Sequence, residues 1–110
     1  MEVKQVLDIL DGNIGKPRLT LRTPVSDLCS FTKEPILGSF IEIKYTPENK
    51  FLGLRSILSF IETCKLEPMD LETFTYKLFI ELKSIFTDVQ LSAHYILSTG
   101  IVLDLEYLYE

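Results

Sequence analysis

The spacing of apolar residues changes twice along this chain of 110 residues, and that change constrains the fold class. Apolar and polar residues alternate over 18–23 and over 39–45, as they do in half-buried β-strands. From Phe51 the apolar residues recur at helical spacing, and from Val89 the alternation returns. The order strand, strand, helix, helix, strand, strand predicts an α+β domain with a four-stranded antiparallel sheet.

Two helices are predicted between the strand pairs. The first should run from about Phe51 to Cys64, because Pro68 bars its continuation. The second should begin after Asp70, which stands where an N-cap belongs, and end near Phe86. Its apolar face consists of Leu71, Phe74, Leu78, Phe79, Leu82 and Ile85.

The last two strands, 89–97 and 101–108, should form a hairpin around the Thr99-Gly100 turn. Residues 1–15 fit no single element, since apolar residues at helical spacing are followed by the breaking run Asp11-Gly12-Asn13. The length accommodates one core, so we expect a single domain over 1–110.

Both predicted helices must lie on one face of the sheet, which leaves the opposite face without cover. Four apolar residues fall on that outer face, namely Phe40, Ile96, Val102 and Leu108. Their presence favours a homo-oligomer in which another copy covers the face. The alternative is a two-sided core within one chain.

Composition excludes several classes of function. A net charge of −5 and scattered basic residues argue against non-specific nucleic-acid binding. We expect a soluble, cytoplasmic protein that does not bind membranes, because no apolar run could span a bilayer and no leader pattern opens the chain. Cys29 and Cys64 should be free thiols. With His94 as the single histidine and no Cys-x-x-Cys spacing, we expect no metal site.

Cys29 is the candidate nucleophile, since it lies in a short polar segment between two predicted strands. A thiolate in such a loop would be accessible to substrate and strongly nucleophilic. Lys33 and Arg55 are the basic residues that could lower its pKa, although both are equally explained as surface charges. The alternative role of Cys29 is that of a small buried apolar residue.

The segment from Thr23 to Pro35 resembles the nucleophile segment of the QueF-type nitrile reductases that act on 7-cyano-7-deazaguanine. Their pattern is a Leu-Cys-Pro-x-Thr-Gly-x-Pro-Asp run, matched here at Leu28, Cys29, Thr32 and Pro35. Tyr45-Thr46-Pro47 is similar to that family's Tyr-x-Pro strand end. The resemblance implies the tunnelling fold, ββααββ, from about Arg18 onward. The short length is similar to that of the archaeal relatives, which attach ammonia to the same nitrile in transfer RNA to make archaeosine.

The family's motifs are only partly kept. Its general acid, the Asp after the proline, corresponds to Ile36 or Leu37. Its cofactor-associated Glu-Ser-Lys-Ser run is replaced by Gly53-Leu54-Arg55-Ser56, which loses the carboxylate and disfavours NADPH. Its His-Glu pair becomes Leu71-Glu72, and its Arg-Gly-Gly turn becomes Ser98-Thr99-Gly100.

The resemblance implies a role in the 7-deazaguanine chemistry of queuosine or archaeosine. Cys29 would attack the nitrile to give a thioimide, which ammonia would resolve in preference to NADPH. Glu72 would hold a purine-like base, although a Glu in the first helical turn is favoured in any helix. Arg55 and Ser56 would contact a cofactor or phosphate. The family assembles as pentameric rings that pair into decamers.

Two other functions remain open from the sequence. One is a tunnelling-fold protein without turnover that binds a purine- or pterin-like ligand through Glu72. The other is an oligomeric structural module. His94 is expected to be an ordinary polar-face strand residue, and Cys64 a packing residue.

Overall fold

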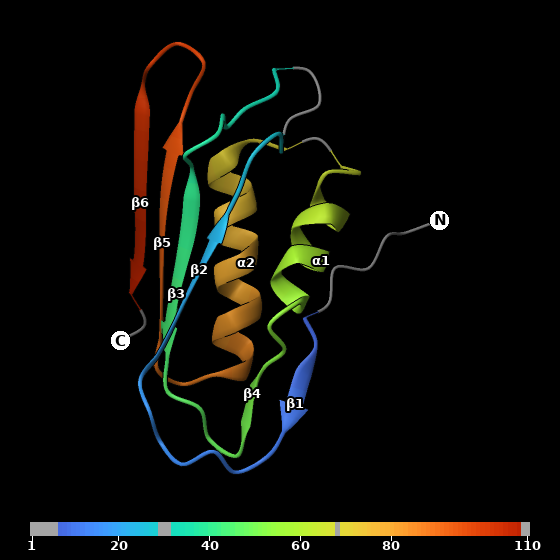
Figure 1. The fold of residues 1–110 in the computed structure, drawn as a ribbon, viewed down its shortest axis with the longest axis vertical. Helices are drawn as coiled ribbons and strands as arrows, with labels where there is room; N and C mark the ends of the chain where they lie inside the picture. The colour runs from blue at the N-terminus through green and yellow to red at the C-terminus, as the bar shows by residue number, and fades with distance from the viewer. Residues whose placement is uncertain (1–6, 29–31, 68, 109–110) are drawn as a thin grey trace.

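The computed structural model describes residues 7–28, 32–67 and 69–108 (Figure 1). In this part of the chain the two helices are α1 (Ser56–Cys64) and α2 (Leu71–Ile85). The six strands are β1 (Ile9–Asp11), β2 (Leu19–Pro24), β3 (Phe40–Tyr45), β4 (Lys50–Leu52), β5 (Val89–Ile96) and β6 (Val102–Leu108). The fold is α+β, as predicted.

Four strands form the main sheet in the order β2-β3-β5-β6, and every neighbouring pair is antiparallel. Both helices lie on the same side of this sheet (Figure 1). The predicted order of two strands, two helices and two strands is therefore confirmed for the main sheet. The predicted strand at 18–23 is shifted by one residue relative to β2, and the predicted hairpin strands each extend one residue further toward the turn than β5 and β6.

The core lies between the sheet and the helices. Along β5 every second residue is fully buried, and β3 shows the same alternation. The inward side chains of the two central strands are Ile41, Ile43, Tyr45, Val89, Leu91, Ala93 and Tyr95, all 3% exposed or less. They pack against the buried residues Phe74, Leu78 and Leu82 of α2 and Phe60 of α1. The alternate residues of the strands and the apolar faces of the helices therefore pack together in one core.

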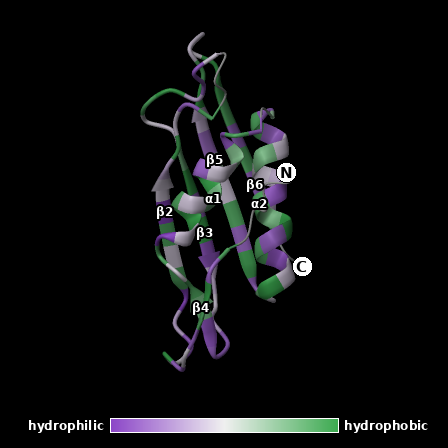
Figure 2. Ribbon diagram, turned by 90° about the vertical axis from the view of Figure 1, so that its right-hand side faces the viewer, coloured by the Kyte–Doolittle hydropathy of each residue, from purple (hydrophilic) through white to green (hydrophobic). Residues whose placement is uncertain are grey.

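The helix α2 begins and ends where the sequence predicts. Asp70 is its N-cap, and the carboxylate of Asp70 accepts a hydrogen bond of 2.7 Å from the backbone N–H of Thr73. This bond lowers the pKa of Asp70. Phe86 is the C-cap residue. Hydrophobic and hydrophilic residues occur along the whole of α2 (Figure 2), as a helix with one buried face requires.

A second, two-stranded sheet corrects the sequence prediction. Strands β1 and β4 pair antiparallel, with Ile9 opposite Leu52 and Asp11 opposite Lys50. The first helix was expected to start at about Phe51, but residues 50–52 form β4 and α1 begins only at Ser56. The hydroxyl of Tyr45 accepts a 3.0 Å hydrogen bond from the backbone N–H of Leu52, which fixes β4 against the core.

The outer face of the main sheet is mainly polar. Val102 and Leu108, at opposite ends of β6, are about half exposed, whereas Phe40 and Ile96 are partly buried. Phe40 stacks on His94 and lies under the guanidinium of Arg22, 4.5 Å from the ring centroid. Neither described helix combines the length and the apolar character needed to cross a membrane.

Candidate functional site

The loop that joins β2 to β3 is closed across its base by backbone hydrogen bonds. The N–H of Val25 donates to the carbonyl of Ser39 at 3.0 Å. The N–H of Asp27 donates to the carbonyl of Pro35, also at 3.0 Å. The two arms of the loop therefore lie side by side, and Asp27 lies against Pro35.

The predicted nucleophile belongs to this loop. Cys29 follows Leu28, whose side chain is buried, and residues 29–31 lie outside the part of the chain that the structure describes. Thr32, on the other side of this segment, is exposed.

The same loop is bonded to the β5–β6 hairpin. The N–H of Ile36 donates to the carbonyl of Ile96 at 2.9 Å, and the N–H of Ile96 donates to the hydroxyl of Ser39 at 2.8 Å. Glu34 accepts two hydrogen bonds from Ser98, one from its N–H at 2.7 Å and one from its hydroxyl at 2.9 Å. These bonds fix the second arm of the loop relative to the end of the sheet.

Glu72 lies at the same end of the molecule, because α2 begins where β2 ends and where the β2–β3 loop emerges (Figure 1). Its side chain is exposed and has no ion pair or hydrogen bond with another described residue. Asp70 supplies the cap of the helix, so the carboxylate of Glu72 is not needed for that bond. The carboxylate is free to accept hydrogen bonds from a ligand.

Arg55 and Ser56 lie at the start of α1, the end of this helix that is farther from Glu72. Arg55 is the exposed N-cap residue, and its side chain makes no capping bond. Ser56 is buried, and its hydroxyl donates to the carbonyl of Gly53 at 2.8 Å. The helix α1 has nine residues and is about 13 Å long at 1.5 Å per residue, so its first residues lie about that far from its other end. The start of α2, which carries Glu72, and the described arms of the loop thus lie at one end of the molecule, and Arg55 and Ser56 lie away from that end.

The positions that align with the family's general acid carry apolar side chains on the surface. Ile36 is 38% exposed and Leu37 is 84% exposed. Two other carboxylates lie on the described arms of this loop. Glu34 is engaged by Ser98, whereas the exposed side chain of Asp27 has no partner among the described residues. Sequence reasoning missed Asp27, whose proximity to Pro35 depends on how the loop closes.

A second pair of polar residues appears only in the structure. His94 on β5 is directly opposite Asp104 on β6, and its Nδ1 lies 2.7 Å from the Asp104 carboxylate. The pair lies beside a shallow hollow of about 360 Å³ on the outer face, next to Phe40, Ser92 and Glu106. His94 was expected to be a polar-face residue, but its pairing with Asp104 follows from the hairpin register.

Cys64 packs in the core, as predicted. Its side chain is 1% exposed, and burial raises the pKa of its thiol to about 11. Such a thiol is a poor nucleophile at neutral pH. Across the described part of the chain, no three His, Cys, Asp or Glu side chains come close enough together to hold a metal ion.

Neither a family model nor a curated protein matches this chain. The family resemblance therefore depends on the residues quoted above and on the order of the elements.

Proposed function

We propose that this chain is a tunnelling-fold enzyme of 7-deazaguanine chemistry that uses Cys29 as its nucleophile. One observation supports this proposal most strongly. The two arms of the loop that contains Cys29 are anchored at the end of the sheet where α2 begins with the unpaired carboxylate of Glu72. A nucleophile segment and a base-binding carboxylate at one end are what the reaction needs.

In the proposed reaction the sulfur of Cys29 attacks the nitrile carbon of 7-cyano-7-deazaguanine. The C≡N triple bond becomes a C=N double bond, and the thiol proton is transferred to the nitrile nitrogen, so the product is a thioimide. Ammonia then adds to the same carbon, and the thiol leaves. The products are an amidine and the regenerated cysteine, and no redox cofactor is consumed.

Asp27 takes the role of proton carrier in this scheme. Its backbone is bonded to Pro35, the residue after which the related enzymes place their acid. Its carboxylate would accept the thiol proton and deliver it to the nitrile nitrogen. Glu72 would hold the ring N–H and amino group of the base through its two oxygens.

We also propose that copies of this chain assemble into a ring through the edges of the main sheet. In the described sheet β2 and β6 each have a neighbour on one side only, so both edges could pair with other copies. A neighbouring copy would then enclose the ligand at the open end of the sheet. The pentamer and decamer implied by the resemblance are assemblies of this kind.

Intact mass spectrometry after incubation with 7-cyano-7-deazaguanine tests the proposal. We expect a gain equal to the ligand mass in the unmodified protein and in Cys64→Ala, and no gain in Cys29→Ala. Asp27→Asn should slow adduct formation by about 10²-fold or more, a typical effect for a lost acid–base group. Glu72→Gln should weaken ligand binding by about tenfold through loss of one charge-assisted contact.

Each negative outcome selects an alternative. Reversible binding without an adduct would identify a ligand-binding protein that has lost turnover. Absence of any binding of 7-cyano-7-deazaguanine or a pterin, with the fold intact, would leave the structural module.

A further inference from the structure

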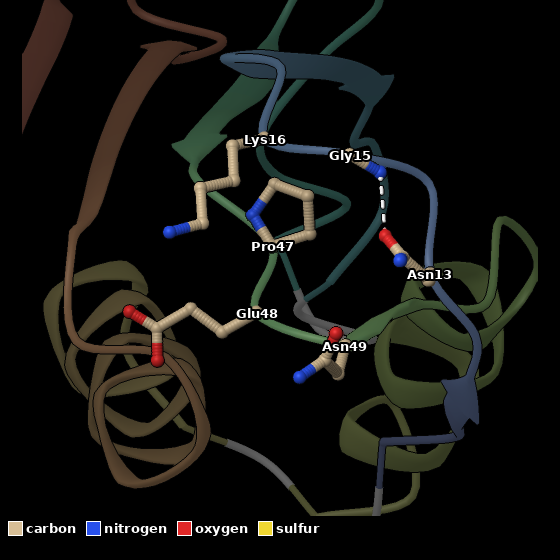
Figure 3. Close-up of a pocket in the computed structure, with 6 residues that line it drawn as sticks. All are labelled: Asn13, Gly15, Lys16, Pro47, Glu48 and Asn49. Atoms are coloured by element: carbon tan, nitrogen blue, oxygen red, sulfur yellow. Dashed lines mark hydrogen bonds between the residues drawn. The ribbon is translucent and has the colours of Figure 1, made fainter.

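A hollow of about 430 Å³ lies where the segment between β1 and β2 meets the β3–β4 connection. It is lined by Asn13, Gly15, Lys16, Pro47, Glu48 and Asn49 (Figure 3). These segments lie at the opposite end of the main sheet from the start of α2 (Figure 1). The hollow is therefore separate from the site proposed above, and neither proposal depends on the other.

The walls of the hollow are held in place by hydrogen bonds. The N–H of Gly15 donates to the side-chain oxygen of Asn13 at 3.0 Å (Figure 3). The N–H of Gly12 donates to the carbonyl of Asn49 at 3.1 Å, which joins the two segments. Asn49 itself has a φ of 60°, a left-handed conformation that Asn tolerates well. The lining backbone is thus ordered before any ligand arrives, which lowers the entropy cost of binding.

Two exposed side chains of opposite charge, Lys16 and Glu48, line this hollow. No salt bridge joins Lys16 to Glu48, and Lys16 has no ion pair with any residue in the described ranges. One carboxylate oxygen of Glu48 accepts a 3.0 Å hydrogen bond from the hydroxyl of Thr87, which orients the side chain. Both side chains extend to the same side of Pro47 (Figure 3). The site therefore offers one cationic and one anionic group to a single ligand.

We propose that this hollow binds a free α-amino acid through its two charged groups. The ammonium of Lys16 would hold the ligand carboxylate, and the carboxylate of Glu48 would hold the ligand ammonium. The amide oxygen of Asn13 is already engaged by the N–H of Gly15, and in Figure 3 Asn13 and Asn49 lie on the other side of Pro47 from the two charged ends, so Lys16 and Glu48 carry the recognition. Pro47 also lines the hollow, but it is buried and offers little surface to a ligand.

The charge pattern distinguishes this ligand class from simpler ones. A phosphate or a simple carboxylate would pair with Lys16 but would be repelled by Glu48. A simple amine would pair with Glu48 but would be repelled by Lys16. A zwitterion satisfies both residues, and its size suits a hollow at the small end of the usual range for ligand sites.

Titration of the ¹⁵N-labelled full chain with each of the twenty common amino acids, up to about 10 mM, tests the inference at millimolar affinity. We expect at least one amino acid to shift the amide signals of Gly12, Gly15 and Asn49. The N-acetyl derivative and the carboxamide of that amino acid each lack one charge, so each should bind about tenfold more weakly.

Matched variants locate the binding. Lys16→Gln and Glu48→Gln should each weaken binding by about tenfold, since each removes one charge-assisted contact. Lys33→Gln removes an exposed lysine in the β2–β3 loop and should leave the affinity unchanged. Cys29→Ala should also bind normally, which separates this result from the proposed catalysis. The inference is wrong if no amino acid shifts these signals, or if the singly charged derivatives bind as tightly as the parent.

Discussion

At the residue scale, the two cysteines occupy different kinds of segment: Cys64 lies on a helix in the core, and Cys29 belongs to the segment between β2 and β3. Cys64 is enclosed by the core, where burial raises the pKa of its thiol to about 11. The sequence predicted its packing role from its place on an apolar helix face. Cys29 lies in a polar loop segment, where its pKa depends on contacts that the sequence does not specify. Only one of the two thiols is therefore a candidate for chemistry.

We predict that Cys64 is almost inert in the folded protein. At pH 8 a thiol of pKa about 11 carries about a hundredfold less thiolate than one of pKa 9. In a Cys29→Ala background, labelling with a chromogenic disulfide should be slow in buffer and should accelerate sharply once urea unfolds the chain. Rapid labelling of the folded variant would contradict the buried position of Cys64.

The Cys64 thiol should also make the free energy of unfolding depend on pH in the alkaline range. Its folded pKa is raised above the unfolded value of about 9, so the unfolded chain loses its proton first as the pH rises. The free energy of unfolding should therefore fall between about pH 9 and pH 11. Tyr45 and Tyr95, whose pKa values are also raised by burial, should extend the fall to higher pH. Urea titrations at several pH values measure the slope, and Cys64→Ala should reduce it between pH 9 and pH 10.

At the scale of elements, α2 carries the main contact between the helices and the sheet. Leu78 is fully buried, whereas Ile80, two residues later, is 39% exposed on the same helix. Leu78→Ala should lower the free energy of unfolding by about 2–5 kcal/mol, because it leaves a cavity in the core. Ile80→Ala, which removes a similar number of atoms from the surface, should cost about 1 kcal/mol or less. Urea unfolding followed by circular dichroism measures both, and equal losses would contradict the layered arrangement.

The long elements were predictable because each has a strong local pattern. The helix α2 has an Asp70 cap and an apolar face over fifteen residues, and its bounds were predicted correctly. Strands β1 and β4 have three residues each, too few to establish a period, and their pairing joins residues about forty positions apart. That pairing follows from the tertiary structure, as does the late start of α1.

Site residues, too, could be predicted only where the local sequence carries the signal. The motif resemblance made Cys29 and Glu72 candidate site residues, and their roles stay predictions. Asp27 beside Pro35 and His94 beside Asp104 could not be identified in this way. Their proximity is set by loop closure and hairpin register, which depend on long-range hydrogen bonds.

At the scale of the whole molecule, the main sheet ends in two strands that each lack a neighbour on one side within the described chain, β2 and β6. Exposed edges of this kind pair readily with other copies. Val102 and Leu108, about half exposed on β6, add apolar surface at the same edge. Pairing of this edge with another copy would satisfy its free backbone groups and would bury Val102 and Leu108.

We therefore predict that the protein self-associates. Size-exclusion chromatography with light scattering should give a multiple of the chain mass of 12.7 kDa, and the ring proposal specifies five or ten copies. Because association stabilises the folded state by mass action, the melting temperature should rise with protein concentration. Val102→Lys with Leu108→Lys would place charge at the contact and should reduce the mass, whereas Lys83→Gln on α2 should not. A mass of one chain at every concentration, with a constant melting temperature, would contradict the proposed assembly.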